Sequence, residues 1–166
     1  MYEMRYAKEQ VAKYKAALDR LEITPNSRVI DVGCGSGLLF NHIADQVQTV
    51  IGVDLSGKLL IHAKERARNF RNIHLIQADA DYLPFKNNNF NVVFAFTLLQ
   101  NMPKYMETLF EIKRISDRGA SVVATGLKKA FSLEVFSASL HDAGLNVVSL
   151  EDADELKCYV AVTIRN

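Results

Sequence analysis

The sequence has few of the residues that mark secreted, metal-binding or membrane-spanning proteins. Only two cysteines occur among its 166 residues, Cys34 and Cys158, and neither belongs to a Cys-x-x-Cys motif or a Cys/His cluster. We therefore expect no disulfide and no metal site. Met1 begins a polar segment unlike a signal peptide, and no run approaches the ~20 apolar residues that cross a bilayer. These absences predict a cytoplasmic protein without a membrane partner.

Net charge is also small. With 20 Lys and Arg against 19 Asp and Glu, the formal net charge is +1, so no broad field attracts nucleic acid or an anionic membrane. A length of 166 residues, 49% of them hydrophobic, suits one well-packed domain. We expect a single domain over residues 1–166, in which residues 1–24 form an N-terminal helical lid.

The most informative motif lies at residues 29–37, which read Val-Ile-Asp-Val-Gly-Cys-Gly-Ser-Gly. An apolar run interrupted only by Asp31 near its end is typical of a strand buried on both faces. Gly33, Gly35 and Gly37 then allow positive φ and leave room for a ligand against the backbone. Helical periodicity resumes in the next segment. A strand, a glycine loop and a helix start together predict a nucleotide-type binding loop.

Two alternatives compete for this loop. A dinucleotide-binding loop has glycine at its first, third and sixth positions and holds a pyrophosphate at the helix N-terminus, but the sixth position here is Leu38. The Asp31 carboxylate would repel a pyrophosphate, whereas it suits a ligand that carries an ammonium and a sulfonium. The second alternative is a tight turn without a ligand. Cys34 is interpreted as a small structural residue, because no His lies nearby in the sequence to activate it.

Helical and strand patterns alternate along the rest of the chain. Helical periodicity covers residues 6–21, 38–46, 57–70, 103–116 and 132–141, and strand patterns cover residues 28–32, 49–53, 73–77, 90–96, 121–125, 145–150 and 157–164. Two strands follow each other only at the end. This order predicts an α/β fold with a Rossmann-like, doubly wound, seven-stranded, mainly parallel sheet and a C-terminal antiparallel hairpin.

Acidic residues end three successive predicted strands. Asp31, Asp54 and Asp79 lie there, and ligands of open α/β sheets bind beyond the carboxyl ends of the strands. Asp54 can accept hydrogen bonds from two ribose hydroxyls, while Leu55 covers one face of a base. Asp79 can accept from the exocyclic amine of adenine while the Ala80 N–H donates to a ring nitrogen. One such acid is commonly a turn or cap residue, but three indicate a nucleoside with an amino-acid tail.

The combined motifs resemble the class I S-adenosylmethionine-dependent methyltransferases, in particular their small type 11 branch. The resemblance covers about residues 29–125. Besides the glycine loop, it rests on Val-Asp-Leu-Ser at 53–56, Ala-Asp-Ala at 78–80, Tyr-Leu-Pro-Phe at 82–85 and Phe-Asn-Val-Val at 90–93. It implies S-adenosylmethionine as the cofactor and transfer of its methyl group as the activity.

The resemblance also implies positions for the cofactor. Gly33 and Gly35 would lie along its methionine and ribose portions, and Leu98, after the fourth strand, would lie near the methyl sulfonium. The motifs and the resemblance together give this set of expected cofactor-binding residues: Asp31, Gly33, Gly35, Gly37, Asp54, Leu55, Asp79, Ala80, Thr97 and Leu98.

The segment after the fourth strand departs from family members that methylate planar nitrogens. Residues 97–102 read Thr-Leu-Leu-Gln-Asn-Met and lack the Asn-Pro-Pro-Tyr or Asp-Pro-Pro-Tyr signature of those enzymes. The resemblance therefore disfavours planar amide or exocyclic nitrogens as acceptor atoms. The four histidines are interpreted as surface or packing residues, so no catalytic residue is assigned.

The sequence leaves the acceptor and the partners open. The acceptor is a small molecule, an RNA or a protein. Because no cap domain is inserted between the strands, either a large acceptor supplies its own shape, or a partner subunit, such as a second copy of the chain, completes the pocket. The resemblance implies a further possibility, a small activating subunit, because some members of the branch work with one. A different class of function is an S-adenosylmethionine-binding scaffold or regulatory subunit without independent catalysis. An NAD-dependent reductase is disfavoured by Leu38 and Asp31.

Overall fold

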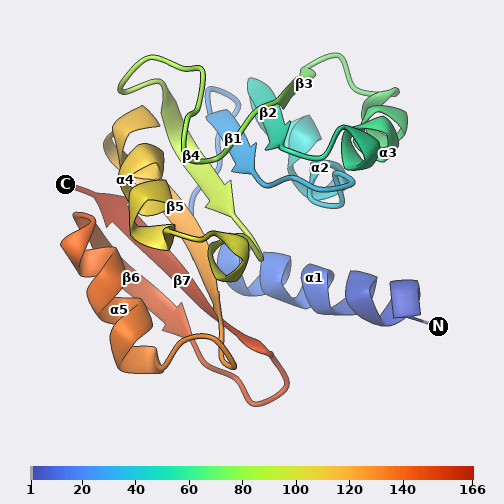
Figure 1. Ribbon diagram of the computed structural model, residues 1–166. Coiled ribbons are helices and arrows are strands. Elements are labelled where there is room, and N and C mark those ends of the chain that lie inside the picture. The colour runs from blue at the N-terminus through green and yellow to red at the C-terminus, as the bar shows by residue number, and fades with distance from the viewer. Residues whose placement is uncertain (1) are drawn as a thin grey trace.

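The computed structural model describes residues 2–166, whose strands form a seven-stranded sheet in the order β3-β2-β1-β4-β5-β7-β6 (Figure 1). Met1, the first residue of the expected lid, lies outside the described residues. The strands β3, β2, β1, β4 and β5 are parallel, whereas β7 is antiparallel to both β5 and β6. The predicted fold class is therefore confirmed. The strand bounds are β1 Arg28–Val32, β2 Thr49–Asp54, β3 Ile73–Gln77, β4 Phe90–Ala95, β5 Ser116–Leu127, β6 Leu145–Glu151 and β7 Cys158–Arg165.

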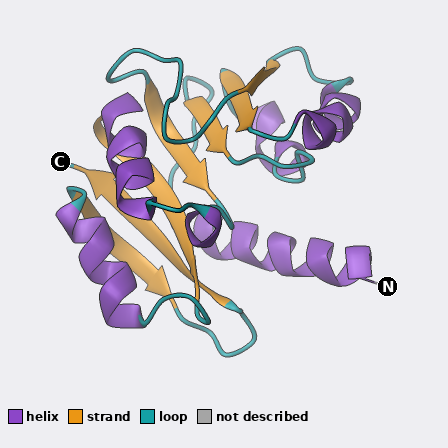
Figure 2. Ribbon diagram, viewed as in Figure 1, coloured by secondary structure: helices purple, strands orange, loops and turns teal. Residues whose placement is uncertain are grey.

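Helices cover both faces of this sheet (Figure 2). Buried residues of α4 and α5 belong to one hydrophobic cluster, and buried residues of α1, α2 and α3 belong to the other. No helix within residues 2–166 is long and apolar enough to cross a membrane. The helices are α1 Tyr2–Leu18, α2 Phe40–Ile43, α3 Gly57–Ala67, α4 Tyr105–Ile115 and α5 Leu133–Asp142, with short 3₁₀ turns η1 Ala44–Gln46 and η2 Leu99–Asn101.

The central strands are buried on both faces because their apolar side chains alternate between the two clusters. In β1, Ile30 packs into the cluster under α4 and α5, and Val29 packs into the cluster under α1 to α3. In β4, Val93 packs into the cluster under α4 and α5, and Phe94 packs into the cluster under α1 to α3. This two-sided burial explains the continuous apolar runs in the sequence, and it leaves only the strand ends free to bind a ligand.

Several element bounds differ from the sequence expectation. The helix expected over residues 38–46 is only α2 and η1, and α3 stops at Ala67 rather than near residue 70. The strand expected over 121–125 begins at Ser116, directly after α4. Gly119 has a φ of 76° inside β5, next to a shift in the pairing of β4 with β5. A glycine that resembles a helix terminator thus marks an irregular stretch of strand.

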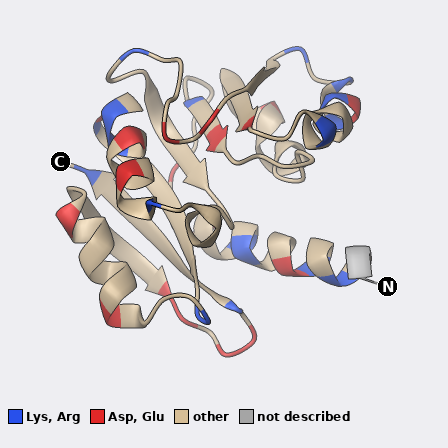
Figure 3. Cartoon of the chain, viewed as in Figure 1, with Lys and Arg blue, Asp and Glu red and all other residues tan. Residues whose placement is uncertain are grey.

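Charged residues lie mainly on helices and loops, where positions of both signs are interspersed along the chain (Figure 3). The helix α3 is mainly basic, with Lys58, Lys64 and Arg66 against Glu65, whereas α5 carries Glu134 and Asp142 without Lys or Arg. This distribution agrees with the small net charge and with the absence of a broad basic face expected from the composition.

Candidate functional site

The glycine loop after β1 lies at the carboxyl edge of the sheet. Gly33, Gly35 and Gly37 have φ values of 76°, 55° and 77°, in the left-handed region that glycine adopts without strain. The N–H groups of Gly33 and Cys34 both donate to the Val53 carbonyl, at 2.8 and 2.9 Å. These hydrogen bonds attach the loop to the end of β2. The ends of β1 and β2, which carry Asp31 and Asp54, are therefore held side by side.

The three loop glycines differ in the space that surrounds them. A Cβ added to Gly33 would come within 3.0 Å of Leu98 Cδ1, on the wall that follows β4. A Cβ at Gly37 would collide with the Phe40 ring. A Cβ at Gly35 would meet no atom within 4 Å. Gly37 therefore serves the packing of the loop on α2, whereas Gly33 and Gly35 keep space open above the sheet edge.

The Asp54 side chain is oriented by two backbone groups. Its Oδ2 accepts a hydrogen bond from Gly35 N at 2.8 Å, and its Oδ1 accepts one from Ser56 N at 2.8 Å. A carboxylate oxygen can accept more than one hydrogen bond, so both oxygens retain acceptor capacity for a ligand. Leu55 follows with 66% of its surface exposed, beside the opening of the site.

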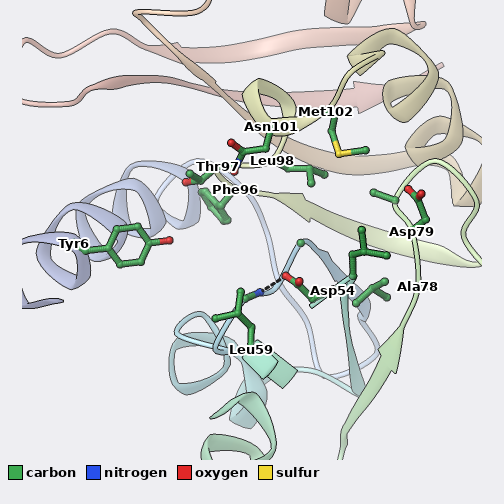
Figure 4. A pocket seen from close by; sticks show the side chains of 15 residues that line it. Tyr6, Asp54, Leu59, Ala78, Asp79, Phe96, Thr97, Leu98, Asn101 and Met102 are labelled. Carbon is green, nitrogen blue, oxygen red and sulfur yellow. Dashed lines mark hydrogen bonds between the residues drawn. The ribbon is translucent and has the colours of Figure 1, made fainter. Parts of the chain in front are cut away.

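A cavity of about 350 Å³ lies beyond the ends of β1, β2 and β4 (Figure 4). This volume is within the range of about 300–1,000 Å³ that small-molecule sites have. Two carboxylates, Asp54 and Asp79, line the cavity, and no Lys or Arg among the described residues does so. An acidic cavity without a basic side chain suits a cationic ligand and disfavours a pyrophosphate. The cavity therefore fits a nucleoside sulfonium rather than NAD.

Asp31 lies in a smaller cavity of about 40 Å³ next to the main one. Gly33 and Gly35 line both cavities, and Gln10 and Tyr14 of α1 enclose the Asp31 side. Burial, and then the negative charge of Asp54, raise the pKa of Asp31 to about 7. An ammonium group placed beside Asp31 would favour its ionised form, because opposite charges attract strongly at a buried site.

The third acid, Asp79, begins a tight turn after β3. Its Oδ1 accepts a hydrogen bond from Asp81 N at 2.9 Å, and Ala80 between them is buried. A clamp from α4 holds the next part of this loop. Arg114 donates to the Leu83 carbonyl at 3.0 Å, and Glu111 accepts from the Leu83 N–H at 2.8 Å. The loop that presents Asp79 and Ala80 is therefore fixed by side chains distant in sequence.

The structure brings most of the expected cofactor residues together. Eight of the ten line the main cavity: Gly33, Gly35, Asp54, Leu55, Asp79, Ala80, Thr97 and Leu98. Asp31 lines the adjoining cavity instead. Gly37 lines neither cavity and packs against Phe40. Gly37 therefore supports the loop without facing the cavities, although its spacing in the sequence is the same as that of the other two glycines.

The sequence expectation missed several residues that line the main cavity. Phe96 and Leu59 belong to regular elements or their ends and carry no motif. Asn101 ends the η2 turn and Met102 follows it, in the segment that was expected to shape the acceptor pocket but of which only the first two residues were expected to bind the cofactor. The only available signal for the missed residues was their proximity to a strand end. Tyr6 was not missed, because it was expected as a lid residue that could close the cofactor site, and it lines the cavity from α1 (Figure 4).

The cavity contains no evident base. None of the four histidines lines either cavity within residues 2–166. Cys34 is buried and donates weakly to the Gly35 carbonyl, and burial raises the pKa of its thiol far above the ordinary value. A thiol that stays protonated is a poor nucleophile, so the geometry favours the structural interpretation of Cys34. No cluster of three or more metal-binding side chains occurs among the described residues.

Comparisons with known proteins give the chain a family. The family model described as a methyltransferase domain matches residues 29–119. A demethylmenaquinone methyltransferase from Staphylococcus saprophyticus is 31% identical over 112 residues, which are 66% of this chain and 48% of that protein. The chain thus spans about half the length of the curated relatives it matches.

Solved structures share the fold over nearly the whole chain. An S-adenosylmethionine-dependent methyltransferase from Aquifex aeolicus has a TM-score of 0.82 at 16% identity, covering 92% of this chain and 89% of that one. A chain from the complex between the Haloferax volcanii Trm112 methyltransferase activator and a methyltransferase has a TM-score of 0.78 at 16% identity, covering 95% and 93%. The family match and these likenesses agree with the acidic cavity and the glycine loop. The chain belongs to the methyltransferase domain family, with the class I fold, and S-adenosylmethionine is its cofactor.

Proposed function

We propose that this protein transfers the methyl group of S-adenosylmethionine to a small, largely apolar acceptor. The observation that carries the proposal is the cavity at the sheet edge, which has acidic side chains, an open glycine loop and no basic side chain from the part of the chain that the structure describes. The relative named as a demethylmenaquinone methyltransferase supports a small-molecule acceptor of the quinone class.

In this proposal the cofactor lies across the ends of the four strands β1, β2, β3 and β4. Asp54 accepts from its ribose hydroxyls, and Leu55 covers the adenine. Asp79 and the Ala80 N–H hold the polar edge of adenine, and Asp31 faces the ammonium of the methionine portion. Gly33 and Gly35 make room for the part of the cofactor that joins its ribose to its methionine ammonium. Thr97 and Leu98 form the cavity wall near the methyl group. The carboxylates also offset the positive charge of the cofactor within a partly closed cavity.

The bound cofactor supplies an activated methyl group, whose transfer leaves a neutral thioether. No histidine lines the described cavity, and its two carboxylates, Asp54 and Asp79, hold the cofactor in this proposal. The residues of this chain therefore contribute mainly position and exclusion of water, and the proton that the acceptor loses passes to solvent. Phe96, Leu98 and Met102 give the acceptor side an apolar character, and Asn101 adds one polar group there. Such a wall suits a ring or hydrocarbon acceptor more than a phosphate-rich one.

The alternatives from the sequence are kept as outcomes to be tested. The likeness to a methyltransferase from an activator complex supports a partner-dependent enzyme. RNA and protein remain the alternative acceptors from the sequence. A homodimer would complete the pocket in another way, and a regulatory subunit would bind the cofactor without transferring its methyl group. The single-domain organisation, the lid role of α1 and the cytoplasmic location remain predictions from the sequence.

Transfer of labelled methyl groups tests the proposal. The protein and methyl-labelled S-adenosylmethionine are incubated, in separate reactions, with demethylmenaquinone kept in its reduced quinol form, total RNA, total protein or a small-molecule extract. We expect label in the demethylmenaquinone or in an apolar product of the extract. Label confined to RNA or protein would overturn the small-molecule acceptor. Cofactor binding without transfer to any pool would overturn the enzymatic proposal in favour of the regulatory subunit.

A further inference from the structure

A fully buried lysine connects α1 to the wall of the cavity. Lys13 is only 1% exposed, which is rare for a lysine unless its charge is paired. Its Nζ lies 3.1 Å from Glu9 Oε1 and 3.3 Å from Thr97 Oγ1. Glu9 also pairs with Lys157, just before β7, at 3.2 Å. Lys13 therefore connects α1 to the end of β4, and Glu9 connects α1 to the start of β7.

Glu9 supplies the negative charge that offsets the cost of burying the Lys13 ammonium. Partial burial alone would raise the pKa of Glu9, but the hydrogen bonds and charges of Lys13 and Lys157 outweigh that effect and hold the pKa below its ordinary value. The carboxylate is thus ionised at neutral pH. Because Glu9 has a second cationic partner, removing the Lys13 charge would not leave an unpaired buried carboxylate.

Thr97 has an unusual backbone conformation that its neighbours maintain. Its φ is 56°, in the left-handed region that is unfavourable for a β-branched residue. Its N–H donates to Thr125 Oγ1 at 2.7 Å, and its carbonyl accepts from Asn101 Nδ2 at 3.0 Å. Its hydroxyl oxygen lies within hydrogen-bond distance of Gln10, with Nε2 at 3.2 Å, as well as Lys13. Every polar group of Thr97 is engaged, and such convergence is what stabilises a strained residue.

The strained residue belongs to the cavity wall. Thr97 lines the main cavity together with Leu98, whose Cδ1 lies 3.0 Å from the position of a Cβ on Gly33 (Figure 4). A change in the Thr97 backbone would therefore move Leu98 relative to the glycine loop. The same helix that holds Thr97 also contributes Tyr6 and Gln10 to the lining of the two cavities. Docking of α1 and the shape of the wall thus depend on the same contacts.

We propose that Lys13 and Gln10 are positioning residues that couple the docking of α1 to the conformation of Thr97 and so to cofactor binding. When α1 is docked, Lys13 and Gln10 hold Thr97 in its strained form and close the cavity from the side of α1. Because coupling between two equilibria is reciprocal, a bound cofactor stabilises the docked helix to the same extent. This proposal rests on the cofactor site described above, although Lys13 itself lines neither cavity.

The first test measures α1 in the cofactor-free protein. Hydrogen exchange of the α1 amides is compared between the wild type, Lys13→Met and the matched control Lys15→Met, whose lysine is exposed on the same helix. We expect Lys13→Met to speed the exchange of α1 about fivefold or more, with Lys15→Met unchanged. Equal protection of α1 in Lys13→Met and the wild type would overturn the coupling. Gln10→Leu breaks the same network without a charge change, and the same outcomes apply to it if Lys13→Met does not fold.

The second test asks whether Lys13 acts through Thr97. Affinity for S-adenosylhomocysteine is measured by calorimetry for Lys13→Met, Thr97→Val and the double variant, with Thr97→Ser as the control that retains the hydroxyl. We expect each of the first two changes to weaken binding, and the double variant to be at least about threefold tighter than independent effects predict. Strict additivity would show that Lys13 does not act through Thr97 and would overturn the proposal.

The two tests also separate this inference from the proposed function. The exchange experiment requires no cofactor and no acceptor, so it stands even if methyl transfer to a small molecule is not found. Conversely, an active enzyme whose α1 protection and cofactor affinity are unaffected by Lys13→Met would leave the proposed function intact and refute the coupling.

Discussion

Asp31 is the residue whose protonation should respond most to the cofactor. Burial and the Asp54 charge raise its pKa to about 7 in the protein without cofactor, so near neutral pH a substantial fraction is protonated. A ligand ammonium favours the ionised carboxylate, so binding releases a proton whenever Asp31 starts out protonated. The sequence placed an acid at this position, but it could not show that the acid is buried.

A pH series of cofactor titrations tests this assignment. Between pH 5.5 and 7 we expect affinity for S-adenosylhomocysteine to rise with pH, by up to roughly tenfold per unit, and to level off above pH 7. Calorimetry in buffers of different ionisation enthalpy should show proton release at pH 6. In Asp31→Asn the pH dependence should be lost. A wild-type affinity that is flat from pH 5.5 to 8 would refute the role of Asp31.

A side chain at Gly33 would have two effects that can be measured separately, namely backbone strain at a positive φ and a close contact with Leu98. Gly33→Ala places a Cβ at a φ of 76° and 3.0 Å from Leu98 Cδ1, whereas Gly119→Ala has the same φ with no atom within 4 Å. We expect Gly119→Ala to lower the free energy of unfolding by about 1–2 kcal/mol and to leave cofactor affinity unchanged. Gly33→Ala should cost more stability and weaken binding. Denaturant unfolding and calorimetry measure both, and equal effects of the two changes would contradict the assigned close approach.

At the scale of elements, α4 supports the site through a clamp on the loop between β3 and β4. Arg114 donates to the Phe85 carbonyl at 2.8 Å and forms a close ion pair with Glu111, with Nη2 to Oε1 at 2.7 Å. Those hydrogen bonds hold the loop that begins with Asp79 and Ala80. The sequence showed α4 only as an amphipathic helix, because periodicity identifies the buried face and is silent about polar contacts made at its edge.

The clamp predicts a linked loss of stability and binding. Arg114→Met should lower the free energy of unfolding by about 1–2 kcal/mol, since it leaves loop carbonyls and Glu111 without their charged donor. It should also weaken S-adenosylhomocysteine binding severalfold, because Asp79 and Ala80 lose their support. The control is Arg118→Met, an exposed arginine of β5. If Arg114→Met bound the cofactor as tightly as Arg118→Met, the clamp would not position the adenine end of the site.

The order of elements could be predicted because each strand and helix carries its own periodic pattern. The bounds were less predictable where a local signal had two meanings. Gly119 looks like a helix terminator, but it lies within β5. Apolar spacing after Leu38 indicates a helix, but the chain first makes two tight turns. Gly37 N donates to the Cys34 carbonyl at 2.9 Å in the first turn, and Phe40 N donates to the Gly37 carbonyl at 3.1 Å in the second. Tertiary packing decides such cases, and no single segment contains that information.

At the scale of the whole molecule, the site is a consequence of strand order. The sheet places β1 between β2 and β4, so residues after these strands meet at one edge. This rule allowed Asp54 and Asp79 to be expected at the site from the sequence alone, whereas the resemblance supplied Leu98. It could not place Tyr6 or Gln10, because the path of α1 across the sheet is set by contacts such as Lys13 with Thr97.

Burial of Asp31 also has a consequence for global stability. Its pKa is raised in the folded protein from 3.8 to about 7, so the folded state binds a proton more tightly than the unfolded state does. The associated stability is fully present below about pH 4 and is lost as pH rises through 7. We expect Asp31→Asn to be more stable than the wild type at pH 8 and similar to it at pH 4.5. Denaturant unfolding at both values measures the difference, and a less stable Asp31→Asn at pH 8 would contradict the expected cost of burying the charge.

The most direct measurement is a calorimetric titration of the cofactor-free protein with S-adenosylhomocysteine, carried out on the wild type, Asp54→Asn and Asp142→Asn. Asp142 is an exposed acid at the end of α5 and serves as the matched control. The account predicts one site per chain in the wild type and Asp142→Asn, and affinity at least about tenfold weaker in Asp54→Asn, because both Asp54 oxygens serve the ligand and the loop. A folded wild type that does not bind, or an Asp54→Asn variant that binds as the wild type does, would contradict it.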